Sequence, residues 1–445
     1  MAGAAQSWSS RTGFLMAAVG FAVGLGNIWR FPYVAGENGG SAFVLMYLLC
    51  VFGIGVPILM AEVLLGRRGK RSPPKSIGLL AANAGLSERW SWIGGLNLAT
   101  SYLILIVYTV VIGWVLYYLY LSLAGGFAGL HAAEATLAFD NLLASPVQLL
   151  LWNALALVLT AGIVYAGVQG GIEPAVRILM PTLFLLMLGL AIYNAFTGGM
   201  PEALSYLFTP DFSKLDGSVM LAAVGQAFFS IGVAMAGMMV FGAYLPDDIS
   251  IGQSAVIIAF ADTMVAIVAG LVIFPLVFAN GLDPAGGAGL VFQTLPVAFA
   301  QLPGIIAILF FLLLSVGGVT SAVGLFEPLV AWAMEQFGIS RRRAVILLAI
   351  FVLLGAVLSV LSYNVLADVQ ILGIALNSAM DFLPNNIMLP LGGLLIALFV
   401  GWRLPRSESF AELRLRDGVY AIWFNALRFL VVPAVAIILV SGLIS

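Results

Sequence analysis

The residues best suited to chemistry lie in one apolar segment near the start of the chain. Its sequence, GFAVGLGNIWRFP at 20–32, places three glycines directly before an amide, a guanidinium and a proline. A helix in lipid cannot leave backbone N–H and C=O groups unpaired, because each unpaired group costs several kcal/mol. A break here is tolerated only where protein, water or a ligand pairs the freed groups. The segment therefore predicts a binding site built on interrupted backbone.

Close helix packing is a second explanation for part of this pattern. The spacing of Gly20 and Gly24 is also one by which membrane helices approach each other. Packing does not account for Asn27, Arg30 and Glu37 in the same apolar segment. Polar and charged side chains are costly inside a membrane and usually have a function there. With these side chains included, a binding site is the stronger interpretation.

The composition is that of a protein that crosses a membrane many times. Hydrophobic residues make up 62% of the chain and charged residues 9%, and no hydrophilic stretch is long enough for a separate soluble domain. No basic cluster is interleaved with aromatic residues, which argues against nucleic-acid binding. Cys50 has no second cysteine to pair with, and a single histidine, His131, argues against a histidine-rich metal site. The first apolar segment is too long for a cleavable signal peptide.

The apolar segments predict an all-α polytopic membrane protein. Each crossing helix needs about 20 apolar residues. A further stretch at 284–302 is expected not to span. The rule predicts eleven transmembrane helices, at 12–36, 41–66, 90–124, 147–166, 172–196, 219–245, 251–280, 304–337, 343–362, 370–402 and 418–443.

The positions of Lys and Arg predict the orientation of these spans. Basic clusters follow the second, eighth and tenth spans at 67–75, 341–343 and 403–416, whereas the loops at 125–146 and 281–303 contain neither residue. Because basic residues concentrate in cytoplasmic loops, even-numbered spans are expected to end inside. The N-terminus is then cytoplasmic and the C-terminus lies outside.

A second interrupted segment predicts an internal repeat. The sequence GQAFFSIGVAMAG at 225–237 lies in the sixth span, which runs opposite to the first. Two discontinuous helices at matching positions of two oppositely oriented halves are typical of inverted-repeat transporters. The repeats are expected at about 12–196 and 219–402, with a peripheral helix at about 418–443, in one transmembrane domain that covers 1–445.

These motifs resemble those of a known family, the neurotransmitter:sodium symporters. The chain is most similar to the bacterial members that transport leucine and other hydrophobic amino acids, in the branch with eleven spans. The resemblance covers nearly the whole chain and implies a 5+5 inverted-repeat core with discontinuous first and sixth helices. The residues that carry it are Trp8 with Arg11, the segment 20–32, Glu37 to Gly40, Glu62, Tyr108, the segment 225–230, and Gly317 to Ser321.

The resemblance implies a site for an amino acid. The backbone N–H groups of Leu25 and Gly26 would bind its carboxylate, because a helix that begins at the break favours an anion. Tyr108 would add a hydroxyl donor, although its position alone is equally consistent with a packing residue. The carbonyls expected to bind the ammonium group belong to Ala22, Phe229 and Ser230. The side-chain pocket would be lined by Ile104, Phe229, Gly232, Met235, Ser321, Gly324 and Leu325, which predicts an aliphatic to aromatic substrate side chain.

The resemblance also implies two Na⁺ sites built from oxygen ligands, as hard cations require. The first would use the Ala22 carbonyl, Asn27, Ser230, Asp262 and the carboxylate of the substrate itself, which would couple the ion to the substrate. The second would use the carbonyls of Gly20, Val23 and Gly317 and the hydroxyls of Thr320 and Ser321. Without the resemblance, these two hydroxyls are expected to bond to carbonyls one helical turn back.

Asp262 departs from the pattern of the chloride-dependent animal members of the family. Those members carry Asn at this position and a chloride-binding Ser one turn later, where this chain has Ala266. A carboxylate beside a sodium ion supplies the negative charge that chloride would otherwise supply. The sequence therefore predicts chloride independence, and it leaves proton counter-transport open.

The resemblance places gates on both sides of the site. Arg30 is expected to pair with Asp381 on the outer side, although neighbouring Asn and Pro residues leave the register near Asp381 open. Trp8, Tyr244 and Glu335 match parts of the cytoplasmic gate, but the basic residue expected near position 5 is absent. Glu335 is therefore expected either to pair elsewhere or to leave a weaker inner gate. Arg428, deep in the last span, has no role in this scheme and is expected either to snorkel or to mark an oligomer contact.

The sequence as a whole predicts a sodium-coupled symporter in the plasma membrane. It would import hydrophobic L-amino acids by alternating access. No phosphate-binding loop suggests ATP, and no Ser/His/Asp or HExxH set suggests an enzyme. The expected partners are the amino acid and the lipid bilayer, without nucleic acid; no oligomeric state is predicted. The alternative is a non-transporting amino-acid sensor of the same fold, and a channel fits the occluded site less well.

Overall fold

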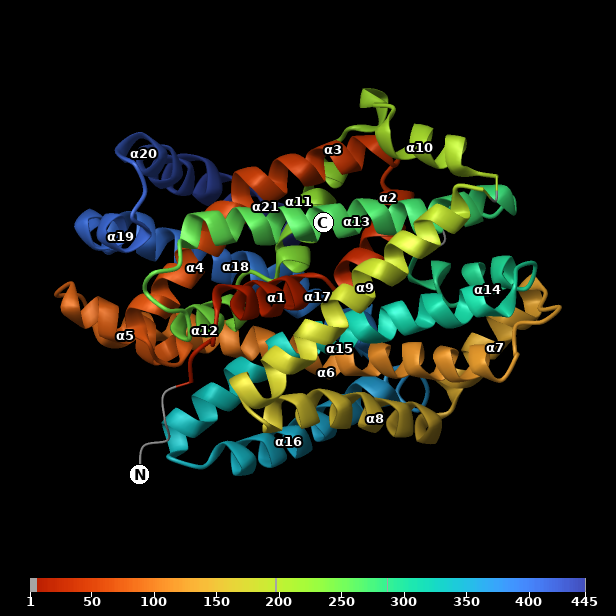
Figure 1. Cartoon of the computed structure of the whole chain (residues 1–445), viewed down its shortest axis with the longest axis horizontal. Helices are drawn as coiled ribbons and strands as arrows, with labels where there is room; N and C mark the ends of the chain where they lie inside the picture. The colour runs from red at the N-terminus through yellow and green to blue at the C-terminus, as the bar shows by residue number, and fades with distance from the viewer. Residues whose placement is uncertain (1–5, 197, 286, 445) are drawn as a thin grey trace.

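The computed structural model describes residues 6–196, 198–285 and 287–444. Most helices run along the long axis of the molecule, and short π-helical or 3₁₀ turns labelled η interrupt or extend several of them (Figure 1). The first half contains α1 (Arg11–Ala22), η1 (Gly26–Arg30), α2 (Phe31–Glu37), α3 (Ser41–Cys50), η2 (Val51–Gly55), α4 (Val56–Gly69), α5 (Pro73–Asn83), η3 (Glu88–Ser91), α6 (Trp92–Leu123), α7 (Ala132–Ala144), α8 (Pro146–Tyr165), η4 (Val168–Ile172), α9 (Glu173–Asn194), α10 (Met200–Phe208) and η5 (Phe212–Lys214).

The second half begins with the interrupted pair α11 and α12. Its elements are α11 (Gly217–Ile231), α12 (Gly237–Ala243), α13 (Ile251–Ala279), η6 (Gly287–Leu290), α14 (Thr294–Phe299), α15 (Gly304–Phe337), α16 (Arg341–Leu361), β1 (Gln370–Ile371), β2 (Ile374–Ala375), α17 (Leu376–Phe382), η7 (Leu383–Met388), α18 (Leu389–Leu398), η8 (Phe399–Arg403), α19 (Arg406–Leu413), α20 (Asp417–Ala426), η9 (Leu427–Val431) and α21 (Val432–Ile444).

Polar residues at the start of several helices fix where these helices begin. Ser10 precedes α1, and its hydroxyl accepts the N–H of Gly13 at 3.0 Å. Asp216 precedes α11, and its carboxylate accepts the N–H groups of Ser218 and Val219, both at 2.9 Å. These contacts pair N–H groups that have no partner inside the helix.

Both predicted interruptions are present. In the first span, α1 ends at Ala22 and η1 begins at Gly26, and the helices on either side are bent by 42°. In the sixth span, the segment 232–236 separates α11 from α12. Ala234 and Ala236 have φ angles of 62° and 63°, a left-handed conformation that costs alanine about 1–2 kcal/mol. The carboxylate of Glu62 accepts the freed N–H of Ala234 at 2.5 Å, so α4 supports this break.

The lengths of the helices agree with the fold class. Among the described residues, nine helical stretches are long and apolar enough to span a membrane, and the bent pair in the first span raises this number to ten. The sixth predicted span consists of two shorter helices, so length alone does not identify it. The count of eleven spans therefore stays a prediction.

The tenth predicted span begins later than expected. Residues 370–375 form a small antiparallel hairpin in which β1 pairs with β2, and Gln370 lies opposite Ala375. Leu372 and Gly373 make its turn, with φ angles of 52° and 80°. The helix begins only at Leu376, because a chain that reverses direction at this turn cannot continue as a helix.

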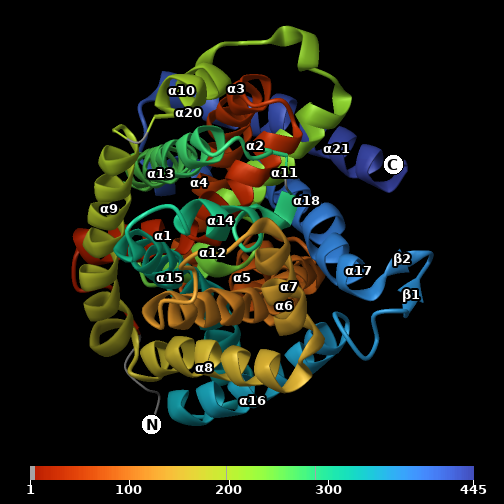
Figure 2. The same ribbon diagram turned by 90° about the vertical axis from the view of Figure 1, so that its right-hand side faces the viewer.

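The interrupted helices lie at the centre of the bundle. Viewed nearly along the helices, α1 and α12 lie inside, whereas α8, α16 and α9 lie towards the periphery (Figure 2). α1 packs against α15 and α9, α12 packs against α4, and α11 packs against α3. The two breaks therefore face each other inside a wall of uninterrupted helices.

Candidate substrate and sodium sites

A buried polar cluster lies beside the two breaks. The Asn27 amide donates to Asp262 Oδ1 at 2.7 Å and to Ser230 Oγ at 2.9 Å. The Ser230 hydroxyl lies 2.9 Å from both carboxylate oxygens of Asp262. Asn27 and Asp262 are completely buried, and Ser230 nearly so. The structure thus brings together the three side chains predicted for the first sodium site.

Tyr47 belongs to the same cluster, although nothing in the sequence indicates this. Its hydroxyl donates to Asp262 Oδ2 at 3.1 Å and lies 3.1 Å from Ser230 Oγ. In the sequence, Tyr47 is one aromatic residue in the apolar helix α3, with no polar neighbours to mark it. The cluster joins η1, α3, α11 and α13, and it gathers oxygen atoms of the kind that sodium prefers.

A second group of oxygens lies between α1 and α15. The Ser321 hydroxyl donates to the Gly20 carbonyl at 3.4 Å. The Thr320 hydroxyl bonds within its own helix, to the carbonyls of Val316 at 3.0 Å and Gly317 at 3.1 Å. Both expectations for these hydroxyls thus describe part of the structure. Of the expected second sodium ligands, Ser321 and Gly20 meet across two helices, while Thr320 makes the ordinary bond one turn back.

A cavity of about 20 Å³ lies between the two breaks. This volume suffices for about one water molecule, so an amino acid requires the lining to move. Of the residues predicted to bind substrate, only Leu25, Ser230 and Gly324 are outside the lining, and one unpredicted residue, Phe21, is part of it. The lining consists of Phe21, Ala22, Gly26, Ile104, Tyr108, Phe229, Gly232, Met235, Ser321 and Leu325.

Phe21 occupies the space left by three glycines. A Cβ atom on Gly324 would lie 2.1 Å from Phe21 Cδ2, and one on Gly237 would lie 2.3 Å from Cε1. A Cβ on Gly232 would lie 2.9 Å from the same Cε1. No side chain fits at such distances, so the ring packs directly against backbone from α15 and the break of the sixth span. The position of Phe21 therefore depends on the absence of side chains at these three glycines.

Tyr108 and Leu25 are already bonded to each other. The Leu25 N–H group, expected to be free for a carboxylate, donates to the Tyr108 hydroxyl oxygen at 3.1 Å. Gly24 is required at this point, because a Cβ there would lie 2.0 Å from Ser321 Oγ and 2.7 Å from Tyr108 Oη. Tyr108 thus lies at the break rather than on a distant packing face, and its hydroxyl can still donate to a ligand.

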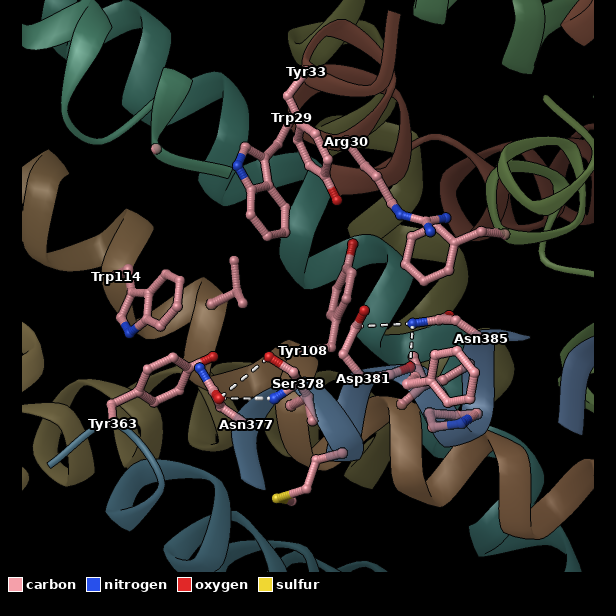
Figure 3. A pocket seen from close by; sticks show the side chains of 18 of the residues that line it. Trp29, Arg30, Tyr33, Tyr108, Trp114, Tyr363, Asn377, Ser378, Asp381 and Asn385 are labelled. Atoms are coloured by element: carbon pink, nitrogen blue, oxygen red, sulfur yellow. Dashed lines mark hydrogen bonds between the residues drawn. The ribbon is translucent and has the colours of Figure 1, made fainter. Parts of the chain in front are cut away.

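A larger cavity of about 520 Å³ lies next to the first and shares Ile104, Tyr108 and Phe229 with it. Figure 3 shows its walls, with Trp29, Tyr33, Trp114 and Tyr363 around an open centre. These three shared residues separate the two spaces. The wider cavity leads from one face of the bundle towards the breaks.

Arg30 and Asp381 both line this wider cavity but form no ion pair within the described residues. The guanidinium of Arg30 lies 4.6 Å from the centroid of the Phe229 ring and donates to Gln226 Oε1 at 3.4 Å. Asp381 accepts a hydrogen bond from Asn385 at 2.8 Å (Figure 3). The predicted partners thus face the same space while each is bonded elsewhere.

The opposite side of the site is closed. The Trp8 indole N–H donates to the Phe241 carbonyl at 2.9 Å, and its backbone N–H donates to the Tyr244 carbonyl at 3.1 Å. The Trp8 ring meets the Phe241 ring edge-on at 5.2 Å and is almost fully buried. The backbone N–H of Ser9 donates to Glu173 at the start of α9, at 2.6 Å. The segment before α1 is therefore held against α12 and α9.

The carboxylate that contacts Tyr244 at this closed side belongs to Glu327, a residue that the sequence did not mark. Tyr244 donates to Glu327 at 2.8 Å, and Glu327 is ion-paired with Arg341. Glu335 lies two helical turns further along α15, where it accepts the Ser72 N–H at 2.8 Å and pairs with Arg71 at 3.5 Å. Both glutamates are on one helix near the same end, so the sequence did not separate them.

Two broken helices facing each other, with polar groups gathered at the breaks, define a membrane transporter with discontinuous helices. A sequence model described as the Sodium:neurotransmitter symporter family matches residues 5–134 and 135–443, and the chain belongs to this family. It is therefore a sodium-dependent transporter that crosses the membrane several times. The family consists of transporters, not enzymes.

Individual relatives agree over nearly the full length. The chain is 36% identical to an uncharacterized sodium-dependent transporter, YhdH, of Bacillus subtilis, over 98% of this chain and 97% of the relative. An uncharacterized sodium-dependent transporter of Haemophilus influenzae is 32% identical over 98% of both chains. The crystal structure of MhsT in complex with L-phenylalanine superposes with a TM-score of 0.92, at 42% identity, over 98% of this chain and 99% of MhsT.

Proposed function

We propose that the protein imports hydrophobic L-amino acids together with Na⁺ by alternating access, without chloride. The observation that carries this proposal is the cavity between the two breaks. Its walls are apolar except for backbone, Tyr108 and Ser321. Such walls suit an uncharged side chain, and the backbone at the breaks suits the charged ends of an amino acid. That MhsT, a similar protein, was crystallised with L-phenylalanine supports a substrate of this class.

The substrate would displace existing contacts when it binds. Its carboxylate would take the Leu25 N–H from Tyr108, and its side chain would press against Phe21 and Met235. Methionine is flexible, so this part of the wall can adapt to both aliphatic and aromatic side chains. The small present volume is consistent with a pocket that opens only when a ligand orders it.

Two sodium ions would accompany the substrate. In the first site Asn27, Ser230 and Asp262 would supply oxygen ligands, and the Asn27 amide would have to turn its oxygen towards the ion. In the second, Ser321 and Thr320 would join the carbonyls of Gly20, Val23 and Gly317. The convergence of these groups at the two breaks supports both assignments.

Chloride independence follows from the charge of Asp262. Its carboxylate is buried against three polar side chains, and none of them is a cation. A sodium ion would provide the missing positive charge, and a second anion would then be superfluous. Ala266, one turn further along α13, offers no group that could hold chloride.

The orientation is also part of the proposal. The end of the bundle closed by Trp8 would face the cytoplasm, and the wider cavity with Arg30 and Asp381 would open outward. The basic clusters that follow the second and eighth spans support this orientation. In the described conformation the wider cavity would then open outward, the three shared residues would separate it from the substrate site, and the cytoplasmic side would be closed.

Uptake into proteoliposomes tests the proposal. Labelled leucine, phenylalanine, tryptophan and glycine are supplied with Na⁺ or K⁺ outside, in chloride or in gluconate. We expect accumulation only with Na⁺, with glycine the poorest substrate and no effect of gluconate. Sodium-dependent binding without accumulation would identify a sensor instead, and a chloride requirement would refute the role of Asp262.

A further inference from the structure

Arg428 is a charged residue in the last membrane-spanning helix that the transport scheme does not use. It lies in η9, between α20 and α21. Among the described residues it forms no hydrogen bond or ion pair, and its Nε atom is buried without an acceptor. A cation in a membrane span is costly unless something satisfies it. The question is what chemistry its surroundings provide.

Aromatic rings surround the Arg428 guanidinium. Its central carbon lies 5.0 Å from the Trp402 centroid, 5.4 Å from Phe424 and 5.3 Å from Phe429. Rings at these distances stabilise the charge but accept few of the five N–H bonds that a guanidinium can donate. The planar group is thus held in place with its hydrogen-bonding capacity unused.

The position of Trp402 indicates the depth of the Arg428 guanidinium in the membrane. Trp402 precedes the final residue of η8, where the tenth span ends, and Arg428 Cγ lies 3.1 Å from where a Cβ on Gly401 would be. The Arg428 side chain therefore runs along the last turn of the tenth span. Tryptophan and snorkelling arginine are typical of the level where lipid headgroups begin. Trp402 is 41% exposed and Phe429 66% exposed, so this site borders the lipid.

A second arginine faces the same aromatic ring. Arg406, at the start of α19, lies 5.5 Å from the Phe424 centroid and 5.4 Å from that of Tyr420. Because the Arg428 guanidinium lies 5.4 Å from the same Phe424 centroid, the central carbons of the two guanidinium groups are at most about 11 Å apart. Arg406 also has no ion pair within the described part of the chain. Two unpaired cations beside one ring repel each other and favour an anion near both.

We propose that Arg428 and Arg406 bind the phosphate of an anionic phospholipid. The guanidinium fork matches a phosphate bidentately, and the phosphate lies at the depth where Trp402 marks the headgroup level. The exposed side chains of Phe429 and Leu430 would contact the acyl chains. Arg406 and Asp417 share a surface hollow of about 340 Å³, in which the carboxylate can accept hydrogen bonds from glycerol hydroxyls of the headgroup.

Native mass spectrometry of the detergent-purified protein, titrated with phosphatidylglycerol or phosphatidylcholine, tests this site. We expect the wild type to prefer phosphatidylglycerol. Arg428→Leu should weaken phosphatidylglycerol binding about five- to tenfold and leave phosphatidylcholine binding unchanged. The matched control is Arg416→Leu, which removes an exposed arginine at the start of α20 that stacks on no ring among the described residues; it should change binding less than twofold.

Three results would overturn the proposal. Equal losses in Arg428→Leu and Arg416→Leu would indicate a general effect of surface charge. Equal binding of the two lipids by the wild type would exclude an anion site, and displacement of the lipid by millimolar inorganic phosphate would indicate a site for the free ion. If Arg428→Leu does not fold, Arg428→Lys decides the matter, because it retains the charge but loses the fork and should weaken phosphatidylglycerol binding by a smaller factor. None of these results depends on the identity of the transported substrate.

Discussion

The contact between Phe21 and Gly324 offers a sharp test of the central cavity. A methyl group at position 324 would lie 2.1 Å from Cδ2, 2.3 Å from Cγ and 2.7 Å from Cβ of Phe21. Rotation of the side chain about Cα–Cβ can relieve the first two contacts, but Cβ moves only with the backbone of α1. Gly324→Ala should therefore force the ring towards the cavity and destabilise the protein by about 1–3 kcal/mol, as overpacked cores do.

The assay combines stability and transport. Melting of the purified variant should occur below the wild-type temperature, and uptake of tryptophan should fall more than uptake of alanine, because the displaced ring reduces space for large side chains. In the double variant Gly324→Ala/Phe21→Ala, loss of Cγ and the ring removes two of the three contacts, so the two substitutions should be coupled by at least about 1 kcal/mol, which a double-mutant cycle measures.

Gly225→Ala is the matched control. Gly225 lies within α11, and a Cβ there would meet nothing within 4 Å. This substitution should be neutral or slightly stabilising, because alanine favours a helix by about 1 kcal/mol over glycine. The reasoning is refuted if Gly324→Ala melts like the control with an unchanged ratio of tryptophan to alanine uptake. It is also refuted if Gly324→Ala and Phe21→Ala destabilise the protein additively, with no coupling between them.

Further predictions concern the polar cluster, the closed side and one surface pair. Asp262→Asn should raise the Na⁺ concentration for half-maximal uptake at least about tenfold, which is about 1.4 kcal/mol, since it removes the negative charge that would face the ion; Tyr47→Phe, which removes one hydrogen bond to this carboxylate, should have a smaller effect in the same sodium titration. Trp8→Ala removes the indole N–H bond and its ring packing, and should weaken equilibrium substrate binding from outside, measured by scintillation proximity, because the closed side opens more readily. A hydrogen bond and charge from Lys70 hold the pKa of the exposed Asp247 carboxyl below its usual range. This pair should contribute its full stability above the ordinary pKa of aspartate and lose it as the pH falls from there through the lowered value; Lys70→Gln should raise the carboxyl pKa in ¹³C NMR, with a change in stability below about 1 kcal/mol.

The sequence predicted the breaks because their cause is local. Three glycines, an amide and a proline within a few residues disfavour a regular membrane-spanning helix, so the segment 20–32 alone predicts a break. The second break at 225–237 was recognised by its matching position in the opposite half. The groups around Asp262 and Ser321 then came from the family resemblance, and the structure brings them together at these breaks.

Most of the features that the sequence does not predict depend on contacts between segments that are distant along the chain. Phe21 lies inside the most conspicuous motif, but its role depends on glycines about 210 and 300 residues away along the chain. Tyr47 is an ordinary aromatic residue until α3 packs beside α13. Glu327 and Glu335 differ only in which neighbour each meets across the bundle. The hairpin at 370–375 falls within the predicted tenth span, because its apolar residues favour a span more strongly than its single turn argues against one.

The two left-handed alanines in the sixth span restrict how the transporter can move. Glycine at positions 234 and 236 would let that segment swivel among many backbone states at little cost. In alanine the left-handed conformation is strained and persists only while its surroundings hold it, and the hydrogen bond from the Ala234 N–H to the Glu62 carboxylate does so. During a transport cycle the bend at 232–236 would then keep its shape and move as a rigid unit, while the uninterrupted helices around it change their orientation.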